Sequence, residues 1–207
     1  CLPLARMADL FDVETFLTTH AELDHFPRDA ECLGTITPKI GNAIEWPATA
    51  YPKVFIYVRD FPALDSLLDF INRSQLSAVA FGASRGQFSR IRFLDQPFDM
   101  AQVAASCDLA ITNGNHGTTS ACLLAGKPVL VIPTVTEQYM IGRRLEEAGV
   151  GRLARPDEVE AVIRGTLVLL RDQSITVCAR QFRDKYAEHD SDRVVEQIVA
   201  RIELMQR

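Results

Sequence analysis

The chain has 207 residues, of which 47% are hydrophobic and 24% are charged, and its formal net charge is −5. These proportions are typical of an ordinary globular domain and exclude low-complexity, disordered and fibrous proteins. The excess of acidic residues offers no electrostatic affinity for a nucleic-acid backbone, so nucleic acid is not an expected partner.

The cysteine pattern and the first residues suggest where the protein is located and that it belongs to a longer chain. Five cysteines form no C-x-x-C pair, a pattern that fits neither a zinc cluster nor a disulfide framework, and we expect a reduced, cytoplasmic setting. No apolar run approaches the roughly 20 residues that span a bilayer, so no integral membrane segment is expected. Position 1 is Cys and the first methionine is Met7, which we interpret as a piece of a longer protein.

Residues 1–50 have weak periodicity and carry several prolines and glycines. This pattern predicts a short helix, a strand and a long connection, as in an inter-domain segment. From residue 51 onward the chain predicts one domain, 51–207, in which short apolar strands alternate with amphipathic helices. The predicted strands are 54–58, 77–81, 91–94, 108–112 and 128–133, and the predicted helices are 64–71, 100–105, 118–125, 137–148, 157–170 and 191–206.

Such regular alternation requires parallel strands joined by right-handed crossovers. The predicted fold class is therefore α/β, a Rossmann-like doubly wound parallel sheet. In such sheets ligands bind at the carboxyl ends of the strands, where the following helix presents unpaired N–H groups.

One loop at that edge is rich in glycine. The run Asn113-Gly114-Asn115-His116-Gly117-Thr118 follows a predicted strand and leads into a predicted helix. Glycine permits close backbone approach and threonine brings a hydroxyl to the helix start, so the loop can hold a phosphate or diphosphate. A tight turn followed by a threonine cap explains the same residues equally well.

A second feature is the pair Glu137-Gln138, which comes shortly after Pro133 ends a buried strand. A carboxylate beside a carboxamide supplies acceptors and donors that match the vicinal hydroxyls of a sugar. The alternative is the ordinary preference of a helix N-terminus for an acidic residue. Because both features are expected at one edge of the sheet, a joint ligand site becomes the better explanation.

The run from Cys107 to Gly151 resembles the nucleotide-sugar half of GT-B glycosyltransferases, which include UDP-glucuronosyltransferases and bacterial antibiotic glycosyltransferases. That family has a His-Gly-Gly-x-Gly-Thr motif, then Gly-x-Pro, a strand, Pro, and Asp or Glu followed by Gln. The positions that match without a gap are Gly114, Gly117, Thr118, Gly126, Pro128, Pro133, Glu137, Gln138 and Gly149. A looser similarity extends over 16–207.

The resemblance implies a role for each matching position. The loop Asn113, Gly114, Asn115, His116, Gly117 and Thr118 would bind the donor diphosphate, Glu137 and Gln138 the donor sugar, and Gln96 and Phe98 the base. It implies a UDP- or dTDP-sugar as substrate, no cofactor, no metal, and a small-molecule or lipid acceptor. Residues 1–50 would lead out of a missing N-terminal acceptor domain, a partner that would hold the catalytic base. The chain alone would then be inactive.

Two positions depart from the family motif: Asn113 stands where the family has His, and Asn115 where it has Gly. Asparagine can donate a hydrogen bond to phosphate but carries no positive charge. We therefore keep three hypotheses: a metal-independent hexosyltransferase-type enzyme, a nucleotide-sugar-binding or structural module with decayed activity, and a nucleotide-sugar epimerase.

The remaining histidines are predicted to be surface residues. His20, His25 and His189 lie in polar stretches and have no ligand spacing with cysteines or carboxylates.

Overall fold

The computed structural model describes residues 15–26, 30–37, 41–47, 51–82, 86 and 88–205. Its centre is a six-stranded sheet in the order β3-β2-β1-β4-β5-β6, in which all paired neighbours are parallel. The strands are β1 (Lys53–Tyr57), β2 (Ser77–Phe81), β3 (Ile91–Leu94), β4 (Leu109–Thr112), β5 (Val129–Val131) and β6 (Gly151–Leu153). This is the Rossmann strand order, and the predicted fold class is confirmed.

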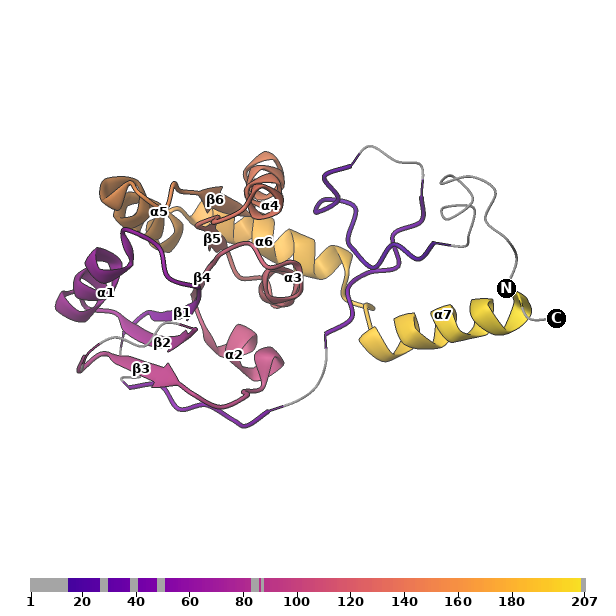
Figure 1. Cartoon of the computed structure of the whole chain (residues 1–207), viewed down its shortest axis with the longest axis horizontal. Coiled ribbons are helices and arrows are strands. Elements are labelled where there is room, and N and C mark those ends of the chain that lie inside the picture. The colour runs from indigo at the N-terminus through magenta and orange to yellow at the C-terminus, as the bar shows by residue number, and fades with distance from the viewer. Residues whose placement is uncertain are drawn as a thin grey trace, which may run out of the picture.

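Helices cover both faces of the sheet (Figure 1). Helices α1 (Leu64–Arg73) and α5 (Val159–Arg171) pack together on one face. The other face carries α2 (Met100–Ser106), α3 (His116–Leu124) and α4 (Thr136–Glu147), with α6 (Gln173–Lys185) against α3. The last helix, α7 (Ser191–Met205), leads away from the sheet.

The central strand β1 shows why the sequence folds this way. Val54 and Ile56 belong to the apolar cluster under α1 and α5, whereas Phe55 belongs to the cluster under α2 and α3. All three side chains are fully buried. A strand covered on both faces needs apolar residues at every position, which is the continuous run that the sequence displays.

Two elements were not predicted. β6 has only three residues, including a glycine and an arginine, so it lacks the apolar run that marks a strand. Helix α6 buries just Ile175, Ala179 and Phe182, a stripe too narrow to stand out in the sequence. In the described parts of 1–50, the predicted helix and strand are absent, because that stretch forms only the isolated bridges Leu17↔Cys32 and Asn42↔Phe98.

The N-terminal segment, defined here as residues 15–26 and 30–37, is held against α6 and the start of α7. Glu22 pairs with Lys185 and accepts a hydrogen bond from the Tyr186 hydroxyl at 2.6 Å. The backbone N–H of Thr37 donates to Ser191 Oγ at 3.0 Å. In Figure 1 this segment is the indigo loop drawn above α7. These polar contacts fix its path in place of regular secondary structure.

The prediction that His20 is a surface residue is wrong, because only 1% of it is exposed. Its Nε2 is hydrogen bonded to Thr35 Oγ1 at 3.1 Å, and its ring packs edge-on against His189 at 5.0 Å between centroids. His25 and His189 are half-buried. Tertiary packing of the N-terminal segment on α6 therefore buries a residue whose sequence neighbours are polar.

Burial gives His20 a measurable signature. It lowers the pKa of His20 to about 4, with a further lowering by His189, because the charged ring is poorly solvated there. The unfolded chain then binds more protons between its ordinary pKa near 6.5 and about 4, so folding stability declines as the pH falls through that range. We expect the urea concentration at the unfolding midpoint to be lower at pH 4.5 than at pH 7. The decrease between these two pH values should be smaller in His20→Gln than in wild type. An equal slope in both proteins would contradict this account.

No helix within the described ranges has the length and apolar character that crossing a membrane requires.

Candidate functional site

The carboxyl ends of β1 and β4 meet where the strand order reverses, the place where doubly wound sheets bind ligands. Asn113 follows β4 and only 1% of it is exposed. Its Oδ1 accepts from the backbone N–H of Arg59 at 2.5 Å, and its Nδ2 donates to the carbonyl of Ile132 at 2.8 Å. The Asn113 carboxamide thus ties together the chain segments that leave β1, β4 and β5, and both its ends are engaged within the protein.

Gly114 brings the loop against α4. Its φ is +91°, a region that favours glycine, and its N–H donates to Thr112 Oγ1 at 3.0 Å. A Cβ at this position would lie 2.9 Å from the Gln138 carbonyl oxygen and 3.0 Å from Val131 Cγ1. The loop and the start of α4, which the sequence placed at one edge, are therefore in direct contact.

The start of α3 is open. Asn115 precedes the helix and its side chain makes no capping hydrogen bond, so the first N–H groups of α3 have no side-chain acceptor among the described residues. A Cβ added to Gly117 would meet nothing within 4 Å. Uncapped N–H groups, the helix dipole and an unobstructed approach together suit an anion.

An aromatic cavity of about 300 Å³ adjoins this helix start. Tyr57 and Phe81 stack in parallel with centroids 5.4 Å apart, and Phe98 stands edge-on to Phe81 at 5.3 Å. The cavity is lined by Ile36, Thr37, Tyr57, Phe81, Pro97, Phe98, Met100, Gly117 and Thr118. A flat aromatic group and an attached anion would fit this cavity and the helix start together.

Of the two residues expected to contact a base, the structure brings only Phe98 to this cavity. Gln96 is exposed and lines a neighbouring cavity of about 220 Å³, which shares Pro97 and Phe98 with the aromatic cavity. Tyr57 and Phe81 were missed because they end strands that were interpreted only as core. The sequence did carry a signal for them: two strands each end in an aromatic residue, at the edge of the sheet where ligands bind.

Glu137 and Gln138 lie in the first turn of α4. Glu137 is exposed. Gln138 Oε1 accepts from the backbone N–H of Thr134 at 2.8 Å and from its hydroxyl at 3.1 Å. Those bonds hold the Gln138 side chain at the helix start, and its Nε2 is the atom that would donate to a ligand.

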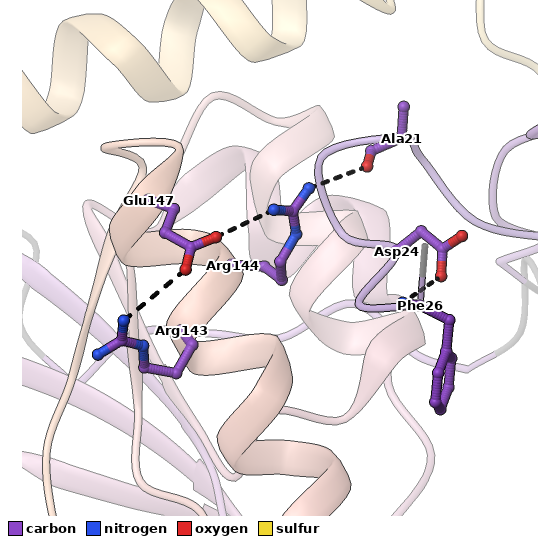
Figure 2. A network of polar contacts seen from close by, with 6 residues as sticks. All are labelled: Ala21, Asp24, Phe26, Arg143, Arg144 and Glu147. Carbon is purple, nitrogen blue, oxygen red and sulfur yellow. Dashed lines mark hydrogen bonds and ion pairs between the residues drawn. The ribbon is translucent and has the colours of Figure 1, made fainter. Parts of the chain in front are cut away.

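The N-terminal segment contacts both α3 and α4. Thr19 Oγ1 lies 2.6 Å from Nε2 of His116, the first residue of α3. Figure 2 shows a second anchor, in which Arg144 of α4 donates to the Ala21 carbonyl at 3.5 Å and to Glu147 at 2.9 Å. Beside the second of these contacts lies a cavity of about 400 Å³, whose lining includes Ala21, Arg144 and His25.

No family model matches the sequence. The curated relatives that it resembles are glycosyltransferases. One is the UDP-sugar-dependent glycosyltransferase 52 of Dictyostelium discoideum, 37% identical over 31% of this chain and 4% of that protein. Another is the elloramycin glycosyltransferase ElmGT of Streptomyces olivaceus, 31% identical over 46% of this chain and 24% of that protein. A sterol 3-beta-glucosyltransferase of Emericella nidulans is 31% identical over 40% of this chain and 6% of that protein.

Solved structures agree on the fold. The calicheamicin glycosyltransferase CalG4 has a TM-score of 0.69 at 17% identity over 85% of this chain, and SnogD from Streptomyces nogalater has 0.67 at 20% identity over 89%. The chain spans 49% and 56% of those two proteins, about half of each. VinC, solved in complex with DTDP, has a TM-score of 0.64 at 20% identity, over 84% of this chain and 49% of that one. In sequence and in fold the chain thus resembles GT-B glycosyltransferases, and its extent is consistent with their C-terminal domain.

Proposed function

We propose that this chain is the donor-binding half of a glycosyltransferase that moves a hexosyl group from a UDP- or dTDP-sugar to an acceptor hydroxyl. The observation that carries the proposal is the junction of the aromatic cavity with the uncapped start of α3 at Gly117 and Thr118. The base would occupy the cavity, and the diphosphate would lie over the first turn of α3.

The protein's own groups can supply the stabilisation that the reaction needs. As the bond to the anomeric carbon breaks, negative charge grows on the departing diphosphate, and the N–H groups and dipole of α3 would stabilise it. Transfer would then require no metal ion. Glu137 and Gln138 would hold the sugar hydroxyls, and an N-terminal domain outside this chain would bring the acceptor and the base.

A non-catalytic nucleotide-sugar-binding module is the second candidate. It is favoured by Asn113, which stands where the resembling enzymes have a histidine. The carboxamide oxygen and nitrogen of Asn113 are both hydrogen bonded to backbone groups of the protein. Turnover by the full-length protein with a panel of nucleotide sugars, with and without EDTA, separates the two. Donor binding without transfer or hydrolysis would favour the second candidate, and loss of turnover in EDTA would contradict metal independence.

Calorimetric titration of this chain with UDP-glucose and dTDP-glucose tests donor binding. We expect Phe98→Ala to weaken the affinity by about 10-fold or more, because base–aromatic contacts contribute about 1–3 kcal/mol each. Gln96→Ala is the matched control, since Gln96 lies in the same loop but outside the aromatic cavity. If Gln96→Ala weakens binding as much as Phe98→Ala, the base does not occupy the aromatic cavity.

A further inference from the structure

His116 is the first residue of α3, and its side chain is hydrogen bonded to Thr19 of the N-terminal segment. Its Nε2 lies 2.6 Å from Thr19 Oγ1, and Thr19 itself is 5% exposed. The Thr19 hydroxyl also lies 3.3 Å from the His20 carbonyl, an acceptor for its single proton. We assign the Thr19 proton to that carbonyl, so that the Nε2–H of His116 donates to Thr19 Oγ1.

This assignment leaves Nδ1 as the unprotonated nitrogen of the neutral ring. Nδ1 is also the ring nitrogen closer to the backbone along the covalent structure of histidine. Since His116 is the first residue of α3, we infer that Nδ1 is the nitrogen that meets an anion at the helix start.

The charged and titratable groups around His116 come from two elements. His20, Asp24 and His25 act on it from the N-terminal segment, and Glu137 acts on it from the start of α4. Burial, and to a smaller extent His25, lower the pKa of His116, while Glu137 and Asp24 act in the opposite direction. The ring is therefore neutral in the free protein at neutral pH.

From this geometry we propose that His116, positioned by Thr19, takes up a proton when the donor diphosphate binds and supplies the charged hydrogen bond that Asn113 cannot give. The inference rests on the proposed function, because it needs the diphosphate at the start of α3. The anion stabilises the imidazolium, and Nδ1–H then donates to a phosphate oxygen. The proton comes from solvent, and Thr19 keeps Nε2–H bonded in both states.

Proton uptake fixes the direction of the pH dependence. Affinity rises as the pH falls, because protons bind more tightly to the complex than to the free protein, and the limit for one linked proton is about tenfold per pH unit. UDP-glucose is the suitable probe. Its diphosphate is esterified at both ends, so it lacks the phosphate ionisation near pH 6 of a terminal phosphate group. Any linkage measured between pH 6 and 8 then belongs to the protein.

The test is calorimetric titration of this chain with UDP-glucose at several pH values, in buffers of small and large ionisation enthalpy. We expect wild type to take up a fraction of a proton on binding and to bind more tightly at pH 6 than at pH 8. His116→Asn should still bind, more weakly at pH 6, with no proton uptake. His189→Asn is the matched control: it removes an imidazole that contacts the N-terminal segment at Thr35 rather than at α3, and the linkage should persist.

Thr19 is tested as a positioning residue. Thr19→Val keeps the shape but removes the hydroxyl, and we expect reduced proton uptake, with a cooperative thermal unfolding transition as evidence that the variant is folded. Thr19→Ser should restore the linkage. Binding that is independent of pH in wild type, or proton uptake that survives in His116→Asn, overturns the inference while leaving the proposed function intact. Absence of UDP-glucose and dTDP-glucose binding at every pH overturns both.

Discussion

Gly117→Ala is expected to bind UDP-glucose at least about tenfold more weakly than wild type, a loss of about 1.4 kcal/mol, without any loss of folding stability. A Cβ at Gly117 meets no protein atom within 4 Å, so the protein itself does not require glycine there. Alanine is the better helix former, and the variant should gain up to about 1 kcal/mol of stability. The added methyl group would instead occupy the space through which the diphosphate approaches α3.

Two measurements check this prediction together: the affinity for UDP-glucose by calorimetry and the unfolding midpoint by urea titration. Thr118→Ala is a useful companion, since it removes a hydroxyl from the same turn without adding an atom. Unchanged affinity in Gly117→Ala would show that no ligand lies over the first turn of α3, and the proposed donor site would have to be abandoned.

Gly114→Ala, three residues earlier, is expected to have the opposite signature. Its φ of +91° is strained for alanine, and the new Cβ would lie 2.9 Å from the backbone oxygen of Gln138, which belongs to a helix and cannot easily move. We expect the free energy of unfolding to fall by about 2–4 kcal/mol. Donor affinity would fall as well, because the loop and the start of α4 would separate.

Urea denaturation of Gly114→Ala and Gly117→Ala side by side is the measurement. A midpoint in Gly114→Ala within error of wild type would mean that the loop can relax away from α4. The contrast between the two glycines matters because they belong to one motif in the sequence. The structure assigns Gly114 to the fit of the loop on α4, and the proposal assigns Gly117 to the ligand.

The sequence by itself determined the sheet. Each central strand is short and mostly apolar, and most are followed by a helix. A local pattern of this kind predicts the sheet because it reflects burial on both faces. It also indicated that the Gly-rich loop and Glu137-Gln138 lie at one edge, since all strands point the same way. The close packing of Gly114 on Gln138, which leaves no room for a Cβ at position 114, confirms this.

Only the tertiary structure decided which atoms are available. Asn113 has a suitable side chain for a phosphate, yet strand ends distant in sequence use both its polar ends. Tyr57 and Phe81 become a stacked pair only because β1 and β2 are neighbours in register. His20 is buried, and His116 is bonded to Thr19, because a segment without regular structure packs on α3, α4 and α6 through polar contacts. Such contacts depend on the positions of individual atoms and do not recur periodically along the chain. Local sequence patterns therefore do not predict them.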